Sequence, residues 1–85
     1  MLYLSMKFNS VESLRDFVTM ADKLPKRVDV ETEDLVINGT SLLGLISVAM
    51  KGTVTVVVDE CEETADFISV LKSPSFGAKV KKYIV

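Results

Sequence analysis

The stretch TVTVVV at residues 53–58 is the most strand-prone segment of this chain of 85 residues. β-Branched side chains pack well on the pleated, half-buried surface of a sheet. The nearly continuous apolar character of the stretch predicts a central strand that is covered on at least one face. We therefore expect the rest of the fold to be arranged around this strand.

Helices are predicted on both sides of this strand. Residues 42–50, LLGLISVAM, form the preceding helix, for which Thr40 or Ser41 is the expected N-cap. A third helix is predicted to begin near Asp59, because the helix dipole stabilises acidic side chains in the first turn. This helix is predicted to stop before Pro74.

The N-terminal part is predicted to be a strand followed by a helix. Residues 3–8 alternate between polar and apolar side chains, which is typical of a half-buried strand. Asn9 or Ser10 then caps a helix whose apolar positions recur at helical spacing until Pro25 ends it. Asn9 and Glu12 have the spacing of a capping box.

Two short strands, at residues 27–32 and 35–37, complete the predicted order β-α-β-β-α-β-α. This order predicts a two-layer α+β domain in which an antiparallel four-stranded sheet carries the helices on one face. Residues 1–72 form this domain, and residues 73–85 form a short C-terminal extension. Within the extension, residues 79–85 are interpreted either as a last strand or as a frayed tail.

The composition excludes most catalytic and metal chemistry. The chain has no histidine and one cysteine, Cys61, which removes an intrachain disulfide, a cysteine-based zinc site, imidazole catalysis and phosphohistidine chemistry. The acidic residues at 59–63 lack the alternation and the glycine of a calcium loop, so they are interpreted as a solvated helix start. We expect no catalytic residues, no metal site and no cofactor, and we predict that the protein is not an enzyme.

Charge and hydropathy argue against two classes of partner. The net charge is −2, and the first 71 residues hold 6 basic and 12 acidic side chains, which is not the basic face of a nucleic-acid-binding domain. No apolar run approaches the roughly 20 residues of a membrane helix, and residues 1–5 do not resemble a secretory signal. A cytoplasmic protein without membrane or nucleic-acid partners is therefore expected.

The helix at residues 42–50 is apolar on every side, although a domain of this size covers only one side of a surface helix. We expect Leu45, Val48 and Ala49 to face the sheet. An apolar patch then remains as a surface for a partner; the alternative is that its side chains lie under a loop or the tail. The side chains expected to face solvent are Leu42, Leu43 and Ile46.

Ser41 stands at the start of the same helix. A hydroxyl there caps free backbone N–H groups, and a phosphate at the same place is stabilised by those groups and by the helix dipole. Both interpretations stay open from the residues alone.

Residues 38–54, NGTSLLGLISVAMKGTV, resemble the region around the regulatory serine of HPr, the small phosphocarrier of the bacterial sugar phosphotransferase system. The similarity is greatest for the Gram-positive members, and the order and spacing of elements agree from residue 4 to residue 71, with a one-residue deletion before Gly52. The resemblance implies an open-faced β-sandwich, and it implies that Ser41 matches the serine that HPr kinase phosphorylates. The residues that match the docking face for partner proteins, of the HPr kinase or transcription-regulator type, are Leu42, Leu43 and Ile46.

The chain departs from this family at the phosphocarrier site. Ser10 stands in the position of the family's phosphoryl-accepting histidine, and Glu12 stands in that of the arginine that holds the phosphate. A carboxylate repels a phosphate, and serine is not a reversible phosphoryl carrier. The chain therefore resembles the histidine-less HPr paralogues of catabolite regulation, with a degenerate phosphocarrier site.

We predict a non-catalytic regulatory or adaptor protein that binds a partner protein through the helix at residues 42–50 and is switched by phosphorylation of Ser41. One alternative is a self-associating structural module, a homodimer that forms through this helix or through residues 79–85 as an added strand. Another is a ferredoxin-like ligand- or RNA-binding domain, although the candidate strands lack the aromatic pairs that stack RNA bases.

Overall fold

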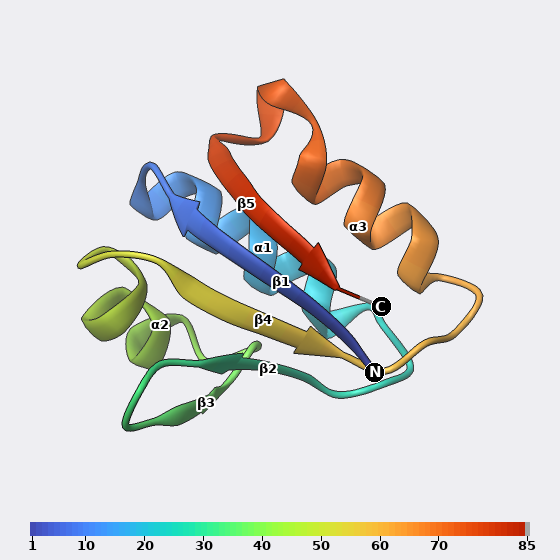
Figure 1. Cartoon of the computed structure of the whole chain (residues 1–85), viewed down its shortest axis with the longest axis horizontal. Helices are drawn as coiled ribbons and strands as arrows, with labels where there is room; N and C mark the ends of the chain where they lie inside the picture. Colours follow the sequence, from blue (N-terminus) through green and yellow to red (C-terminus); the bar gives the residue numbers. More distant parts are fainter. Residues whose placement is uncertain (85) are drawn as a thin grey trace.

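The fold is described by a computed structural model, which covers the backbone of residues 1–84 and the side chains of residues 1–80. A sheet lies in front of the helices in Figure 1. Along the chain, the elements are β1 (Leu2–Phe8), α1 (Val11–Asp22), β2 (Val28–Glu31), β3 (Val36–Asn38), α2 (Leu42–Ala49), β4 (Val54–Val58), α3 (Thr64–Lys72), the short 3₁₀ helix η1 (Pro74–Phe76) and β5 (Ala78–Ile84).

The strands form one antiparallel sheet in the order β3-β2-β4-β1-β5. Buried side chains of α1, α2 and α3 join those of one sheet face in a single core, so the helices cover that face and leave the other open. In Figure 1, α1 lies behind the middle of the sheet, with α2 at the left-hand ends of β4 and β2 and α3 beside β5. The predicted two-layer α+β arrangement is confirmed.

The predicted count of four strands is wrong, because residues 78–84 form a fifth one. β5 pairs with β1, and Ala78 lies opposite Phe8 at one end of the ladder. The edge of β1 would otherwise present unpaired N–H and C=O groups, which β5 satisfies. Of the two interpretations of the C-terminal extension, the strand is confirmed; Val85 lies outside the described residues.

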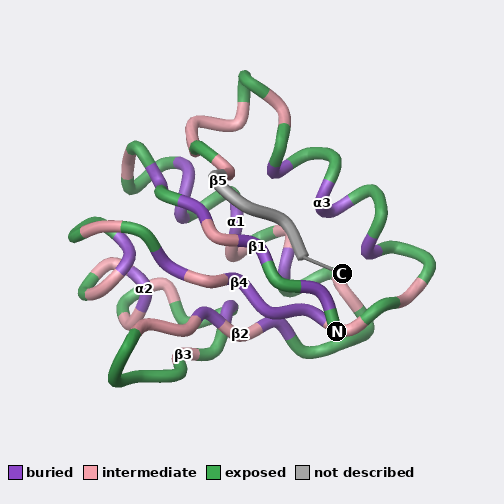
Figure 2. Tube along the Cα trace, viewed as in Figure 1, coloured by how far each residue is buried: buried purple, intermediate pink, exposed green. Residues whose placement is uncertain are grey.

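The core lies between the sheet and the helices. Phe17 of α1 is at its centre, with its ring centroid 5.2 Å from that of Phe8 and 5.7 Å from that of Phe67 in α3. Burying a side chain of this size contributes about 1.5–3 kcal/mol. Figure 2 shows the alternation of buried and exposed positions along β1 that the sequence predicts. The residues of β1 that face the core are Leu2, Leu4, Met6 and Phe8.

The segment TVTVVV does form the middle strand. β4 has β1 on one side and β2 on the other, so both of its edges are paired. Val54, Val56 and Val58 belong to the core. Val57 points to the opposite face and is still only 3% exposed. The strand is therefore buried on both sides at this point, which explains its continuous apolar character.

The predicted start of the third helix is wrong. α3 begins at Thr64 and not near Asp59. The Thr64 hydroxyl accepts a hydrogen bond from the N–H of Cys61 (3.0 Å) and donates one to the carbonyl of Asp59 (2.9 Å). These bonds close a turn over residues 59–63, so the acidic residues precede the helix instead of forming its first turn.

Candidate functional site

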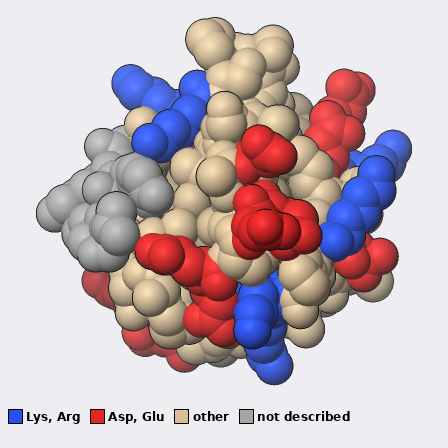
Figure 3. All heavy atoms as spheres, turned by 90° about the vertical axis from the view of Figure 1, so that its right-hand side faces the viewer, with Lys and Arg blue, Asp and Glu red and all other residues tan. Residues whose placement is uncertain are grey.

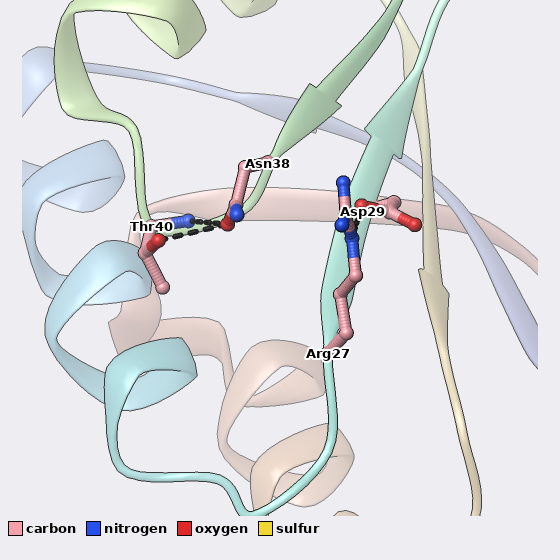
Figure 4. Close-up of polar contacts among 4 residues, drawn as sticks. All are labelled: Arg27, Asp29, Asn38 and Thr40. Carbon is pink, nitrogen blue, oxygen red and sulfur yellow. Dashed lines mark hydrogen bonds and ion pairs between the residues drawn. The ribbon is translucent and has the colours of Figure 1, made fainter.

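The connection between β3 and α2 sets the position of the candidate site (Figure 4). The side-chain oxygen of Asn38 accepts hydrogen bonds from the backbone N–H of Thr40 (2.9 Å) and from the Thr40 hydroxyl (2.8 Å). The N–H of Gly39 donates to the carbonyl of Val28 (2.7 Å), which ties this connection to β2. Because the Thr40 hydroxyl is bonded to Asn38, it does not cap α2.

Ser41 occupies the N-cap position of α2, and its side chain is exposed. Its carbonyl accepts the first helical bond, from the N–H of Leu45 (3.0 Å), but its hydroxyl makes no capping bond. The predicted N-cap position is therefore confirmed at Ser41, whereas the expected capping bond of its side chain is absent. The backbone at Ser41 is extended, with φ −96° and ψ 93°.

Gly44 allows α2 to approach β3 closely at this point. A Cβ atom at residue 44 would lie 2.9 Å from Cγ2 of Ile37 in β3 and 3.0 Å from Oγ of Ser41. Both distances are shorter than a normal van der Waals contact. Gly44 therefore allows α2, with Ser41 at its start, to pack closely against β3 at the sheet edge.

The apolar residues of α2 divide differently from the prediction. Leu45 and Ala49 are fully buried, as expected, whereas Val48 is half-buried. Leu43 is 83% exposed, which confirms that it faces solvent. The other two predicted solvent-facing residues lie at the border of the buried stripe and pack partly against the core: Leu42 and Ile46.

Two exposed apolar residues extend the surface around Leu43. Met50 is seven positions after Leu43, on the same side of the helix, and Leu35 in the turn before β3 is 52% exposed. Leu35 and Ser47 are among the residues that line a shallow hollow of about 490 Å³ between this turn and α2. Sequence reasoning missed both apolar residues, because their exposure follows from the position of β3 at the sheet edge. We define the α2 surface as Leu35, Leu43, Ser47 and Met50, next to Ser41.

Ser10, which the resemblance places at a degenerate phosphocarrier site, caps α1. The Ser10 hydroxyl accepts a hydrogen bond from the N–H of Ser13 (3.2 Å), and the Ser13 hydroxyl accepts one from the N–H of Ser10 (3.3 Å). The capping box is therefore made by this pair and not by Asn9 and Glu12. Glu12 is exposed in the first turn of α1, where the helix dipole stabilises its carboxylate.

Replacing Ser10 with alanine is expected to lower the free energy of unfolding by about 1 kcal/mol, the usual cost of losing an N-cap side chain. Urea denaturation, with an unchanged slope against urea concentration, measures the loss. Ser69→Ala, at an exposed position of α3, is the matched control. An equal loss in both variants would contradict the capping role.

The described residues hold no further reactive cluster. Cys61 is half-buried, and its sulfur lies 3.0 Å from the Thr64 hydroxyl.

Acidic side chains gather in the middle of the face shown in Figure 3. Among the described residues, no group of three histidine, cysteine, aspartate or glutamate side chains is arranged to hold a metal ion. None of the helices in this part of the chain has the length and apolar character of a membrane span.

The geometry of the α2 surface is thus the most distinctive feature of the described residues: an unbonded hydroxyl beside an exposed leucine on a helix pressed against a sheet edge. Comparison with known proteins gives no match to a family model, to a curated protein or to a solved structure.

Proposed function

We propose that the protein is a non-catalytic adaptor of the HPr-like kind, which binds a partner protein through the α2 surface and is switched by phosphorylation of Ser41. The observation that carries the proposal is the pairing of an exposed, unbonded Ser41 hydroxyl with Leu43 at 83% exposure. Exposed apolar side chains on the free side of a surface helix, as Leu43 and Met50 are, fit a protein–protein contact. A hydroxyl that makes no capping bond is free to take a phosphate without loss of an existing interaction.

The charge around Ser41 favours such a switch. The first turn of α2 contains no acidic side chain, and the free N–H groups of this turn point towards the N-cap. A phosphoserine carries about two negative charges, which the helix N-terminus stabilises. Phosphorylation would therefore preserve the fold and would place strong charge directly beside Leu43.

The arrangement of the strands disfavours the ferredoxin-like alternative. In a ferredoxin-like split β-α-β unit, the third strand lies between the first two. Here β4 lies between β1 and β2, and β3 is at the edge. Among the described side chains of the open sheet face, Tyr3 is the single aromatic one, so this part of the face has no stacking pair for RNA bases.

The test uses HPr kinase as the probe, because the resemblance makes it both the modifying enzyme and a partner. We expect intact mass spectrometry to record one added phosphate when the purified protein is incubated with this kinase and ATP. The phosphate should be absent in Ser41→Ala and present in Ser69→Ala, a matched control at an exposed position of α3 outside the α2 surface. Phosphate on Ser41→Ala would contradict the assignment.

Leu43→Glu is expected to lower the rate of phosphorylation by about tenfold or more, because it places a charge in the centre of the docking surface. Val70→Glu is the matched control, since Val70 is 43% exposed on α3. Circular dichroism establishes that both variants fold. Equal rates for the two variants would show that the kinase does not dock on the α2 surface.

A further inference from the structure

The open face of the sheet has its charges separated across the strands. Strands β1 and β2 both pair with β4 and so run in the same direction. In the row formed by the ladder, Tyr3, Val57 and Asp29 are neighbours, and the next row contains Ser5, Thr55 and Glu31. A third row continues towards one end of the sheet. The exposed charged residues of this end are Lys7 and Lys79 on the β1–β5 side, and Glu33 and Asp34 on the β2–β3 side.

Lys7 and Lys79 are direct partners across the β1–β5 ladder, and both are exposed. Like charges directly opposite each other in a sheet are destabilising. An ion pair joins Arg27 and Asp29 (2.7 Å, Figure 4), whereas neither Lys7 nor Lys79 forms one with a described side chain. This lysine pair, the basic corner, therefore has no acidic partner within the described part of the molecule.

The opposite corner of the same end is acidic. Glu33 and Asp34 form the turn that joins β2 to β3, and they follow Glu31, which faces the open side. Lys51 lines the hollow beside this turn but forms no ion pair with either residue. We call Glu33 and Asp34 the acidic corner; it lies at the same level along the strands as the basic corner and on the other side of β4.

We propose that the open face binds a second copy of this chain face to face, about a two-fold axis that runs parallel to the strands above β4. Rotation about such an axis leaves each residue at the same height along the strands and moves it to the opposite side of β4. Strand β1 then faces β2 of the partner copy, and β5 faces β3. The basic corner of each copy then lies over the acidic corner of the other, twice in the dimer. Two sheets packed in this way lie about 10 Å apart, with the helices outside.

Two exposed apolar side chains of this face are available for such contact. Tyr3, 40% exposed, lies in β1 beside Val57, which is itself only 3% exposed. Val36 on β3 is 63% exposed and faces the same side as Glu31. Edge-to-edge pairing through β5 fits the sequence less well, because lysines at positions 79, 81 and 82 blunt that edge against strand addition.

The attraction comes from solvent-exposed pairs, so the association should depend on salt. We expect sedimentation equilibrium to show dimers at low ionic strength and an association constant at least tenfold lower at about 0.5 M NaCl, where the Debye length is a few ångströms. A protein that stays monomeric at millimolar concentration and low salt would overturn the proposal.

A charge exchange tests the geometry. Lys7→Glu/Lys79→Glu and Glu33→Lys/Asp34→Lys should each lower self-association at least tenfold, because each places like charges at both contacts. An equimolar mixture of the two variants should form heterodimers, since both contacts then join opposite charges. Arg15→Glu/Lys23→Glu makes the same change of net charge on α1, away from the open face, and should associate as the original chain does.

Two results would overturn the face-to-face dimer. One is a mixture of the two variants that remains monomeric while each variant is folded. The other is a dimer that responds equally to the α1 control and to the basic-corner variant, because this would indicate contact elsewhere. Leu43→Glu leaves the open face unaltered and should dimerise normally, so that failure of this proposal and failure of the proposed adaptor function are distinguished.

Discussion

Replacing Phe17 with alanine is expected to lower the free energy of unfolding by about 3–5 kcal/mol, the largest effect of any substitution considered. The side chain is fully buried, and its ring contacts Phe8 of β1 and Phe67 of α3. Its removal would leave a cavity at the point where the sheet and two helices meet. A domain of 85 residues has a stability of roughly 4–13 kcal/mol, so a large part would be lost.

Urea denaturation followed by circular dichroism measures this loss, and Phe76→Ala is the matched control. Phe76 is half-buried in η1 and has its ring centroid 6.4 Å from that of Phe8. Because solvent already reaches it and the neighbouring chain can relax into the space, we expect a loss of about 1–2 kcal/mol. Losses of equal size would mean that the core is not centred on Phe17.

Gly39→Ala is expected to destabilise the protein by about 1–3 kcal/mol, the second-largest effect. A Cβ atom at residue 39 would lie 2.8 Å from the carbonyl oxygen of Val28 and 2.9 Å from its Cγ1 atom. That carbonyl also accepts the Gly39 N–H, and Val28 is buried and paired with Val58. The backbone of β2 therefore cannot move away without loss of sheet pairing, and the strain falls on the connection that positions α2.

Gly52→Ala separates this close contact from the general cost of replacing a glycine. A Cβ atom at residue 52 meets no atom within 4 Å, so the free energy of unfolding should change by less than about 0.5 kcal/mol. Gly44→Ala should lie between the two, because the atoms that it meets belong to side chains, which can rotate. A loss in Gly52→Ala as large as in Gly39→Ala would contradict the argument.

Much of the fold could be predicted because the apolar periodicity is strong. The alternation in residues 3–8 and the run at residues 53–58 lead directly to β1 and β4, and the layer arrangement follows from the order of the elements. The start of α3 could not be found in this way, because it depends on hydrogen bonds of the Thr64 hydroxyl that compete with the preference of acidic residues for a helix start. The fifth strand depends on the free edge of β1, which exists only in the assembled sheet.

The candidate site was predictable at its centre and not at its borders. Leu43 is exposed as expected, since the apolar helix can bury only one side, and Ser41 occupies the expected N-cap position. How deeply Leu42 and Ile46 are buried, and whether Leu35 belongs to the exposed α2 surface, depend on how closely α2 approaches β3. That approach is set by Gly44 and by the bonds of Asn38, which are tertiary and local details that apolar periodicity does not report.

The position of β1 has a consequence for how the chain folds during synthesis. Both partners of this first strand, β4 and β5, lie in the second half of the sequence, so β1 leaves the ribosome well before either of them exists. Its pairing requires closure of long loops, which slows folding relative to local contacts. Until then its apolar side chains have no sheet to join, and the emerging chain presents an unpaired strand to other proteins in the cell. Shielding of this segment by a chaperone should therefore raise the yield of native protein more than any aid given to α2 or α3.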